Sequence, residues 1–285
     1  MKLIAESGST RAEWCLLDGN LVVEHAFTEG INPYFRTRKE ISRCIRLQLP
    51  EKFFSRKLDE IIFYGAGCTT DEKKNIVKSS LISQFRVPVS IDSDLLAAAH
   101  SLLGREKGIA CILGTGSNSC YYDGEKIVKN VKPLGYILGD EGGGAVLGKM
   151  FLSDCFKNLA PKEISEKFYD VYRITADDVL DLIYNQPLPN RSLSTFSFFL
   201  ADFLDHEYVY NLIYKNFRRF FVRNILQYDY QTYPVGFMGS VAENYQNILF
   251  DVANEFGVEI SQIVESPMKG LVEYHSPDFF VSTAS

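Results

Sequence analysis

Two short polar segments of this sequence carry residue types that could hold an anion such as phosphate. The first is Ser7-Gly8-Ser9-Thr10, and the second is Gly114-Thr115-Gly116-Ser117-Asn118. Each lies between two apolar runs, which is typical of a tight turn between two strands. Glycine lets a ligand approach the main-chain N–H groups, and the hydroxyls add further donors. One such turn is usually only a hairpin, but two copies indicate a duplicated fold that holds a ligand between its halves.

A carboxylate lies where a strand is expected to end and a helix to begin. Asp94 follows an apolar run that ends at Ile91 and opens an alanine-rich stretch, and open α/β sheets place their sites at such points. There it could accept a hydroxyl proton as a general base. It could instead only favour the helix N-terminus by its charge. Asp92 competes for either role, and Ser93 or Asp92 is the expected helix cap.

A second pair of carboxylates precedes three consecutive glycines. Asp140 and Glu141 stand in the segment LGDEGGG. Beside bare backbone a carboxylate can bind ligand hydroxyls at close range. For Glu141 an acidic cap on a helix that begins near residue 145 is the alternative.

The elements that must position these residues follow from the hydrophobic pattern. The first half is expected to contain strands 2–6, 12–18 and 20–28, a loop at 30–34, helix 37–48, strand 59–64, helix 71–85, strand 87–91 and helix 95–103. After a polar break at 104–108 the second half is expected to contain strands 109–114, 118–123 and 126–131, helix 145–157, three or four helices within 161–229 (the last about 206–229), strand 233–238, helix 241–256, strand 258–264 and a short helix to about His275.

Three antiparallel strands followed by parallel βα units are typical of a ribonuclease-H-like fold. The sequence therefore predicts an α/β protein with a duplicated ribonuclease-H-like, actin-like ATPase fold, in which two lobes surround a cleft. We expect an N-terminal lobe at 1–106 and a C-terminal lobe at 107–266 with a helical insert at about 145–229. Hinges are expected near Gly104 to Gly108 and near Ser266-Pro267, with a cleft lined by Ser9, Thr10, Asp94, Thr115 and Asp140.

Composition excludes several classes of protein. A net charge of -6 and a pI near 5.4 argue against a nucleic-acid surface. The local cluster of basic residues, Arg218, Arg219 and Arg223, is expected to lie on a solvated helix face. No apolar run is long enough to span a membrane, and a strand at the N-terminus leaves no room for a signal peptide. The six cysteines are spread out without a close pair. They predict reduced core residues of a cytoplasmic protein.

Six motifs in order resemble the N-acetylglucosamine kinase branch of the sugar kinases, which shares a family with the BadF/BadG/BcrA/BcrD ATPases. They are SGST at 7–10, GINPY at 30–34, IDSDLLAAA at 91–99, GTGSN at 114–118, LGDEGGG at 138–144 and GFMGSVA at 236–242. The resemblance covers most of the chain. It implies an ATP-dependent kinase that phosphorylates a hydroxyl of an amino sugar, with ATP and Mg²⁺ as cofactors.

The resemblance also implies roles for particular residues. Asp94 is the expected base, because the similar kinases carry an aspartate directly before the alanine-rich turn. The sugar would be bound by Asn32, Asn118 and Asp140, although an Asn before Pro33 is by default a turn residue. The nucleotide would be bound by Gly8, Ser9, Thr10, Gly114, Thr115, Gly116, Gly239 and Ser240. A final helix at about 267–285 would pack back on the first lobe.

One residue departs from the family pattern. The first hairpin usually begins with an aspartate that helps to hold hydrated magnesium, and here the residue is Glu6. Glutamate keeps the charge but reaches further, so the ion could shift or the rate fall. We retain Glu6 as the residue that is expected to help hold the magnesium ion.

Two other classes of function stay open at this point. An ATPase activator would act on a partner protein, and a sugar-binding sensor would have lost catalysis. The sequence does not choose among amino sugars, because pocket walls decide that choice. Exposed aromatic residues expected around Phe196 to Phe203 suggest a homodimer.

Overall fold

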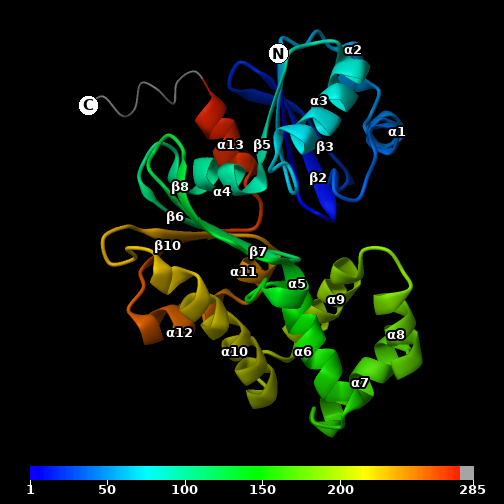
Figure 1. The fold of residues 1–285 in the computed structure, drawn as a ribbon, viewed down its shortest axis with the longest axis vertical. Helices are drawn as coiled ribbons and strands as arrows, with labels where there is room; N and C mark the ends of the chain where they lie inside the picture. The colour runs from blue at the N-terminus through cyan, green and yellow to red at the C-terminus, as the bar shows by residue number, and fades with distance from the viewer. Residues whose placement is uncertain (277–285) are drawn as a thin grey trace. The chain divides into compact units, whose positions relative to one another are not determined.

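The structure is a computed structural model and describes residues 1–276 (Figure 1). The chain divides into two compact units, which are described separately. The first unit comprises Met1–Glu106, Asp123–Ile127 and the chain from Ser266. The second unit comprises Lys107–Tyr122 and Val128–Glu265.

The first unit contains one five-stranded sheet in the order β3-β2-β1-β4-β5. The first three strands are antiparallel neighbours, and β4 and β5 continue the sheet in parallel with β1. Its elements are β1 Lys2–Ser7, β2 Arg11–Asp18, β3 Leu21–Glu29, α1 Arg38–Gln48, α2 Lys52–Ser55, β4 Glu60–Gly65, α3 Asp71–Phe85, β5 Val89–Ser93, α4 Asp94–Leu103 and α13 Met268–His275.

Alternation along the strands gives this sheet two apolar faces. One face, with Leu3 and Trp14, packs against α1 and α3. The other face, with Ile4 and Leu17, packs against α4 and α13, where Leu271 is fully buried. Helices α4 and α13 lie side by side (Figure 1). The predicted helix at 267–285 is thus described as far as His275, and its remainder at 277–285 lies outside the described residues.

The second unit repeats the strand order as β8-β7-β6-β9-β10. Strand β6 is antiparallel to β7 and parallel to β9, and β10 is parallel to β9. Its elements are β6 Gly108–Leu113, β7 Ser117–Tyr122, β8 Ile127–Val131, α5 Gly135–Leu138, α6 Gly144–Phe156, α7 Lys162–Tyr172, α8 Ala176–Tyr184, α9 Pro189–Ser197, the 3₁₀ helix η1 Phe198–Phe203, α10 Glu207–Arg223, the 3₁₀ helix η2 Ile225–Gln227, β9 Val235–Met238, α11 Ser240–Asn244, α12 Gln246–Phe256 and β10 Ile260–Val264.

The expected order of elements is confirmed, with four local differences, one of which is the short helix α2 between the predicted helix 37–48 and the predicted strand 59–64. The predicted helix 206–229 ends at Arg223, because Asn224 donates its side-chain amide to the Phe220 carbonyl and the chain continues as η2. The predicted helix 241–256 is interrupted at Tyr245. The short helix α5 was not expected, since it begins after Leu134 in a left-handed conformation (φ 62°), which aliphatic residues rarely adopt.

The prediction of exposed aromatic residues around Phe196 to Phe203 holds only for Phe198, which is 40% exposed. Phe196 and Phe199 are each only 6% exposed, and Phe203 packs against the same core. Their rings meet Phe168 of α7 at 5.8 Å and 5.5 Å for Phe196 and Phe199. Phe196, Phe199 and Phe203 therefore hold the helical insert together, and the homodimer stays a prediction.

The cysteines are core residues, as predicted. All six are free and buried, and burial raises the pKa of Cys68, Cys120 and Cys155 to about 12. No helix within residues 1–276 has the length and apolar character needed to cross a membrane.

Candidate active site

The first hairpin, which joins β1 to β2 through Gly8-Ser9-Thr10, lies against the loop that follows β3. Gly30 donates its N–H to the Thr10 carbonyl at 2.9 Å. A Cβ on Gly30 would lie 2.6 Å from the carbonyl oxygens of Gly8 and Ser9, so only glycine fits there. The hairpin and the loop are therefore in main-chain contact.

Within that loop Asn32 acts as a turn residue. Its Oδ1 accepts the N–H of Tyr34 at 3.0 Å, and its carbonyl accepts the N–H groups of Phe35 and Arg36. The side chain is largely buried beside Gly67, where a Cβ would lie 2.4 Å from Asn32 Oδ1. The default interpretation of Asn32 is thus supported, and its contact with a sugar stays a prediction.

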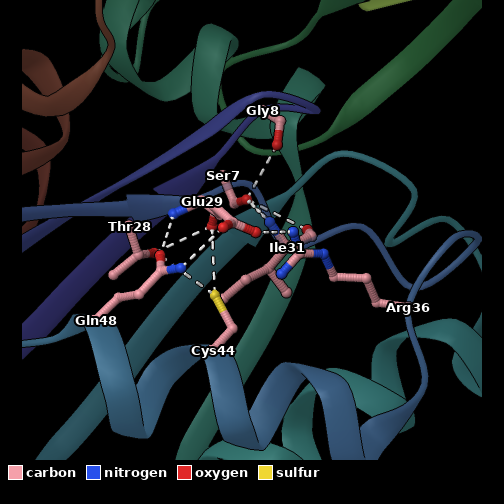
Figure 2. Close-up of polar contacts among 8 residues, drawn as sticks. All are labelled: Ser7, Gly8, Thr28, Glu29, Ile31, Arg36, Cys44 and Gln48. Atoms are coloured by element: carbon pink, nitrogen blue, oxygen red, sulfur yellow. Dashed lines mark hydrogen bonds and ion pairs between the residues drawn. The ribbon is translucent and has the colours of Figure 1, made fainter. Parts of the chain in front are cut away.

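Ser7 joins the hairpin to this loop, although it was not nominated from the sequence. Its hydroxyl accepts the Ile31 N–H at 2.7 Å and lies 3.2 Å from the Ile31 carbonyl and 3.1 Å from the Gly8 carbonyl. Figure 2 shows Ser7 with these partners and with the polar contacts of Glu29. The position of a serine in a hairpin motif does not predict a hydrogen bond with a residue 24 positions along the chain.

Asp94 is the first residue of α4 and follows the carboxyl end of β5 directly. The helix cap is Ser93, whose hydroxyl accepts the Leu96 N–H, while Asp94 Oδ1 accepts the Leu95 N–H at 2.9 Å. Burial raises the pKa of the Asp94 carboxyl to about 6, against the lowering effect of that backbone bond. A carboxylate with such a pKa can take up a proton near neutral pH.

Asp92, the competitor of Asp94, has a different environment. It lies in β5 opposite Tyr64, and its carboxylate is ion-paired with Lys74 at 3.0 Å. The two aspartates therefore differ in their partners, and Asp94 as the base stays a prediction.

Glu6 lies near Asp94 in the first unit. The pKa of Glu6 is raised to about 8, first by burial and then by the charges of Asp94 and Glu13, against the opposing effect of Arg11. Within residues 1–276 no group of three or more His, Cys, Asp or Glu side chains is arranged to hold a metal ion. The donors nevertheless fit Mg²⁺, which is commonly held by one or two carboxylates together with water and phosphate oxygens.

The second hairpin, Gly114-Thr115-Gly116, is held by the first turn of α6. The Gly114 carbonyl accepts the Gly144 N–H at 2.8 Å, and the Thr115 carbonyl accepts the Ala145 N–H at 2.9 Å. Behind it a Cβ on Gly143 would lie 2.7 Å from the Gly116 carbonyl carbon. The glycines of LGDEGGG thus allow helix and hairpin to meet.

Asp140 lies against this hairpin. Its backbone is left-handed (φ 54°), and a Cβ on Gly116 would lie 2.6 Å from Asp140 Oδ2. Burial raises the pKa of the Asp140 carboxyl to about 6, although a bond from the Ser117 backbone lowers it. The structure therefore brings together Asp140, the predicted sugar ligand, and the second hairpin.

Glu141 is buried and ion-paired, so the helix-cap interpretation is wrong. Its carboxylate lies 3.1 Å from Arg223 Nη1 and 4.0 Å from Arg219 Nη2, and α6 is capped by Gly143. Arg218 pairs with Glu255 at 2.8 Å. The arginine cluster thus serves ion pairs on a helix face.

The Gly239-Ser240 turn lies beside the second hairpin, whereas Asn118 is held by neighbouring strands. Gly239 has φ 120°, and a Cβ there would lie 2.4 Å from the Leu113 carbonyl, so the turn before Ser240 lies against the end of β6 beside the second hairpin. Asn118 is engaged elsewhere, because its Oδ1 accepts the N–H of Ser119 and the amide of Asn130, each at 2.9 Å.

Comparison with known proteins supports a class and a family. A scan of protein families and a search of curated proteins both gave no match. Among solved structures, a putative N-acetylglucosamine kinase from Chromobacterium violaceum shares 13% identity over 96% of this chain and 98% of that one, with a TM-score of 0.74. A ROK family glucokinase from Streptomyces griseus, in complex with glucose and AMPPNP, shares 12% identity over 95% and 96%, with a TM-score of 0.57. These likenesses and the repeated strand order define the class, a duplicated ribonuclease-H-like α/β fold.

The family follows from a nearer relative. A putative N-acetylglucosamine kinase from Porphyromonas gingivalis is 40% identical over 98% of this chain and 100% of that one, with a TM-score of 0.93. The chain therefore belongs to the N-acetylglucosamine kinase-like family that this protein represents.

Proposed function

We propose that this protein is an ATP-dependent kinase that transfers a phosphoryl group to a hydroxyl of an amino sugar such as N-acetylglucosamine. The observation that carries the proposal is the full-length similarity to the P. gingivalis protein. Its second support is Asp94, a half-buried carboxyl at the end of a parallel strand with a pKa raised to about 6.

The two hairpins suit the nucleotide. Phosphoryl transfer depends mainly on positioning and on electrostatic stabilisation of the phosphates. Main-chain N–H groups and hydroxyls at Gly8, Ser9 and Thr10, and at Gly114, Thr115 and Gly116, would bind phosphate oxygens. The turn at Gly239-Ser240 would receive the base and ribose. AMPPNP in the S. griseus glucokinase supports ATP as the donor for this fold.

The carboxylates and amides suit the acceptor. Asp94 would orient the reacting hydroxyl and accept its proton, and Asp140 would bind a second sugar hydroxyl. Asn32 and Asn118 would complete the sugar contacts. Both have their side-chain oxygen engaged within the protein, so each would offer its amide N–H group to the sugar.

Glu6 would hold Mg²⁺ on the first-unit side. The ion, when bound, neutralises charge on the transferring phosphates.

A coupled assay of ATP turnover over a panel of amino sugars tests the proposal. The panel should contain N-acetylglucosamine, glucosamine, N-acetylmannosamine and N-acetylmuramic acid, with glucose as the neutral hexose control. We expect ADP release only with an acceptor sugar, and a phosphosugar product in equal amount. ADP release without sugar would favour the ATPase activator, and sugar binding without turnover would favour the sensor.

A further inference from the structure

The backbone of Ser7 is fixed on both sides by the sheet. Ser7 pairs with Ala12 of β2 and with Gly65 of β4, and its carbonyl accepts the Ala66 N–H at 2.8 Å. The residue is fully buried. Its side chain therefore projects from a rigid position at the base of the first hairpin.

The Ser7 hydroxyl has one hydrogen and two acceptors within reach. It accepts the Ile31 N–H at 2.7 Å, and it can donate either to the Ile31 carbonyl at 3.2 Å or to the Gly8 carbonyl at 3.1 Å. One acceptor belongs to the loop that contains Asn32, and the other belongs to the hairpin. Figure 2 shows the hydroxyl between the two.

The far end of the loop is also tied down. Arg36 forms an ion pair with Glu29, and Gln48 of α1 bonds the Glu29 carboxylate at 3.0 Å and the Glu29 N–H at 2.7 Å. Because both ends are held, a shift of the hairpin is transmitted to Ile31 and Asn32 instead of being absorbed by loop motion.

We propose that Ser7 is a positioning residue that couples nucleotide binding at the first hairpin to sugar binding at the Asn32 loop. The inference rests on the proposed function of these two segments. A phosphate that draws the Gly8 peptide toward itself changes which carbonyl takes the Ser7 hydrogen. Ile31 then shifts, and with it the amide of Asn32. The coupling is reciprocal, so sugar must also change nucleotide affinity.

Calorimetry on wild type and two variants tests the coupling. The dissociation constant of Mg²⁺–AMPPNP is measured with and without saturating N-acetylglucosamine, and the ratio is the coupling factor. Ser7→Ala should bring this factor about fivefold closer to one, as expected for one buried hydrogen bond. Loss of packing alone would weaken the binding of both ligands and leave the coupling factor unchanged.

Ser80→Ala is the matched control. Ser80 is also a fully buried serine of the first unit, but its hydroxyl bonds the carbonyls of Arg38 and Ile76, away from the hairpin. Its coupling factor should equal that of the wild type. Equal factors in all three proteins would overturn the role of Ser7 and leave the kinase proposal intact.

Hydrogen exchange on the wild-type protein avoids the risk that Ser7→Ala fails to fold. Mg²⁺–AMPPNP alone, without sugar, should slow exchange of the Gly30 and Ile31 amides. Unchanged exchange with bound AMPPNP would also overturn the coupling. A protein that binds neither AMPPNP nor any sugar of the panel would overturn the proposed function, and the coupling with it.

Discussion

The two hairpins resemble each other in sequence, but the protein supports them differently. Behind each lies a glycine with no room for a Cβ, Gly30 behind the first and Gly143 behind the second. The second hairpin is held by main-chain N–H groups of α6. A side chain contributes at each hairpin, the Ser7 hydroxyl at the first and the Asp140 carboxyl, which accepts a bond from the Ser117 backbone, at the second. The first hairpin thus lies against a loop and the second against a helix, so we expect the first to be the more easily perturbed.

The largest expected effect tests whether the first unit supplies the reacting group. Asp94→Asn should lower kcat by roughly 100- to 10,000-fold with sugar affinity largely kept, because the amide can still bond the hydroxyl but cannot take its proton. Steady-state kinetics and sugar titration measure both. Asp92→Asn, which only breaks the pair with Lys74, should stay active, and the reverse pattern would move the base to Asp92.

A melting curve distinguishes a catalytic loss from unfolding. Since the folded-state pKa of Asp94 is raised to about 6, its charge destabilises the folded protein above that pH. Asp94→Asn should therefore raise the melting temperature at pH 8. A variant that loses both activity and stability would speak against this account of Asp94.

The next effect tests the second unit as the sugar-binding side. Asp140→Asn should weaken sugar binding roughly 10- to 100-fold, the range for a lost bond to a charged partner, with a smaller change in kcat. Asparagine tolerates the left-handed backbone at this position, whereas Asp140→Ala adds strain. The matched neighbour is Glu141→Gln, which loses the arginine pair and should cost stability without changing sugar affinity. Unchanged affinity in Asp140→Asn would remove Asp140 from the site.

A smaller effect compares the supports of the two hairpins directly. Gly30→Ala and Gly143→Ala each place a methyl group against main-chain atoms and should cost about 1 to 3 kcal/mol of unfolding free energy. At the hairpin tip, Gly114→Ala meets no described atom within 4 Å and should leave stability nearly unchanged. Urea denaturation measures all three. Equal stability of the three variants would show that the backing glycines are not close-packed.

The last comparison separates the two units by acid. Tyr64 hydrogen-bonds His100 Nδ1 at 2.8 Å and His275 Nε2 at 2.9 Å. Burial, followed by nearby positive charge, lowers the pKa of His100 to about 3 and of His275 to about 4. The unfolded chain therefore binds protons first as pH falls below about 6.5, and the first unit loses up to about 1.4 kcal/mol per pH unit for each histidine.

Fluorescence of Trp14, the single tryptophan, reports this unit, because the ring is buried in its core. Stability measured between pH 7 and 4.5 should fall less steeply in His100→Gln, while His206→Gln in the second unit should match the wild type. An unchanged slope in His100→Gln would contradict the assignment.

The order of elements was predictable because it depends on local patterns. Alternating strands, the Ser93 cap and the duplicated hairpins are all visible within short windows. Asp94 could be nominated for the same reason, since a strand end and a helix start define its place. The polar contacts of Asn118 and Glu141 could not be predicted, because tertiary packing brings their partners, Asn130 and Arg223, to them.

The error at Phe196, Phe199 and Phe203 has a related cause. An apolar stripe shows that a helix is covered on one face, but it does not identify the element that covers it. Here that cover comes from α7, through Phe168. The contacts of Gly30 and Ser7 likewise could not be predicted from the motifs that contain them, since close backbone approach appears only in three dimensions.

The return of α13 to the first unit sets an order of events during synthesis. Tyr64 and His275 are 211 positions apart, and the second unit lies between them in the chain. While a ribosome is still adding α13, the sheet face of Ile4 and Leu17 lacks the part of its cover that α13 supplies beside α4. The first half to be made is thus the last to be finished, and the nascent chain exposes an apolar surface of the kind that chaperones bind.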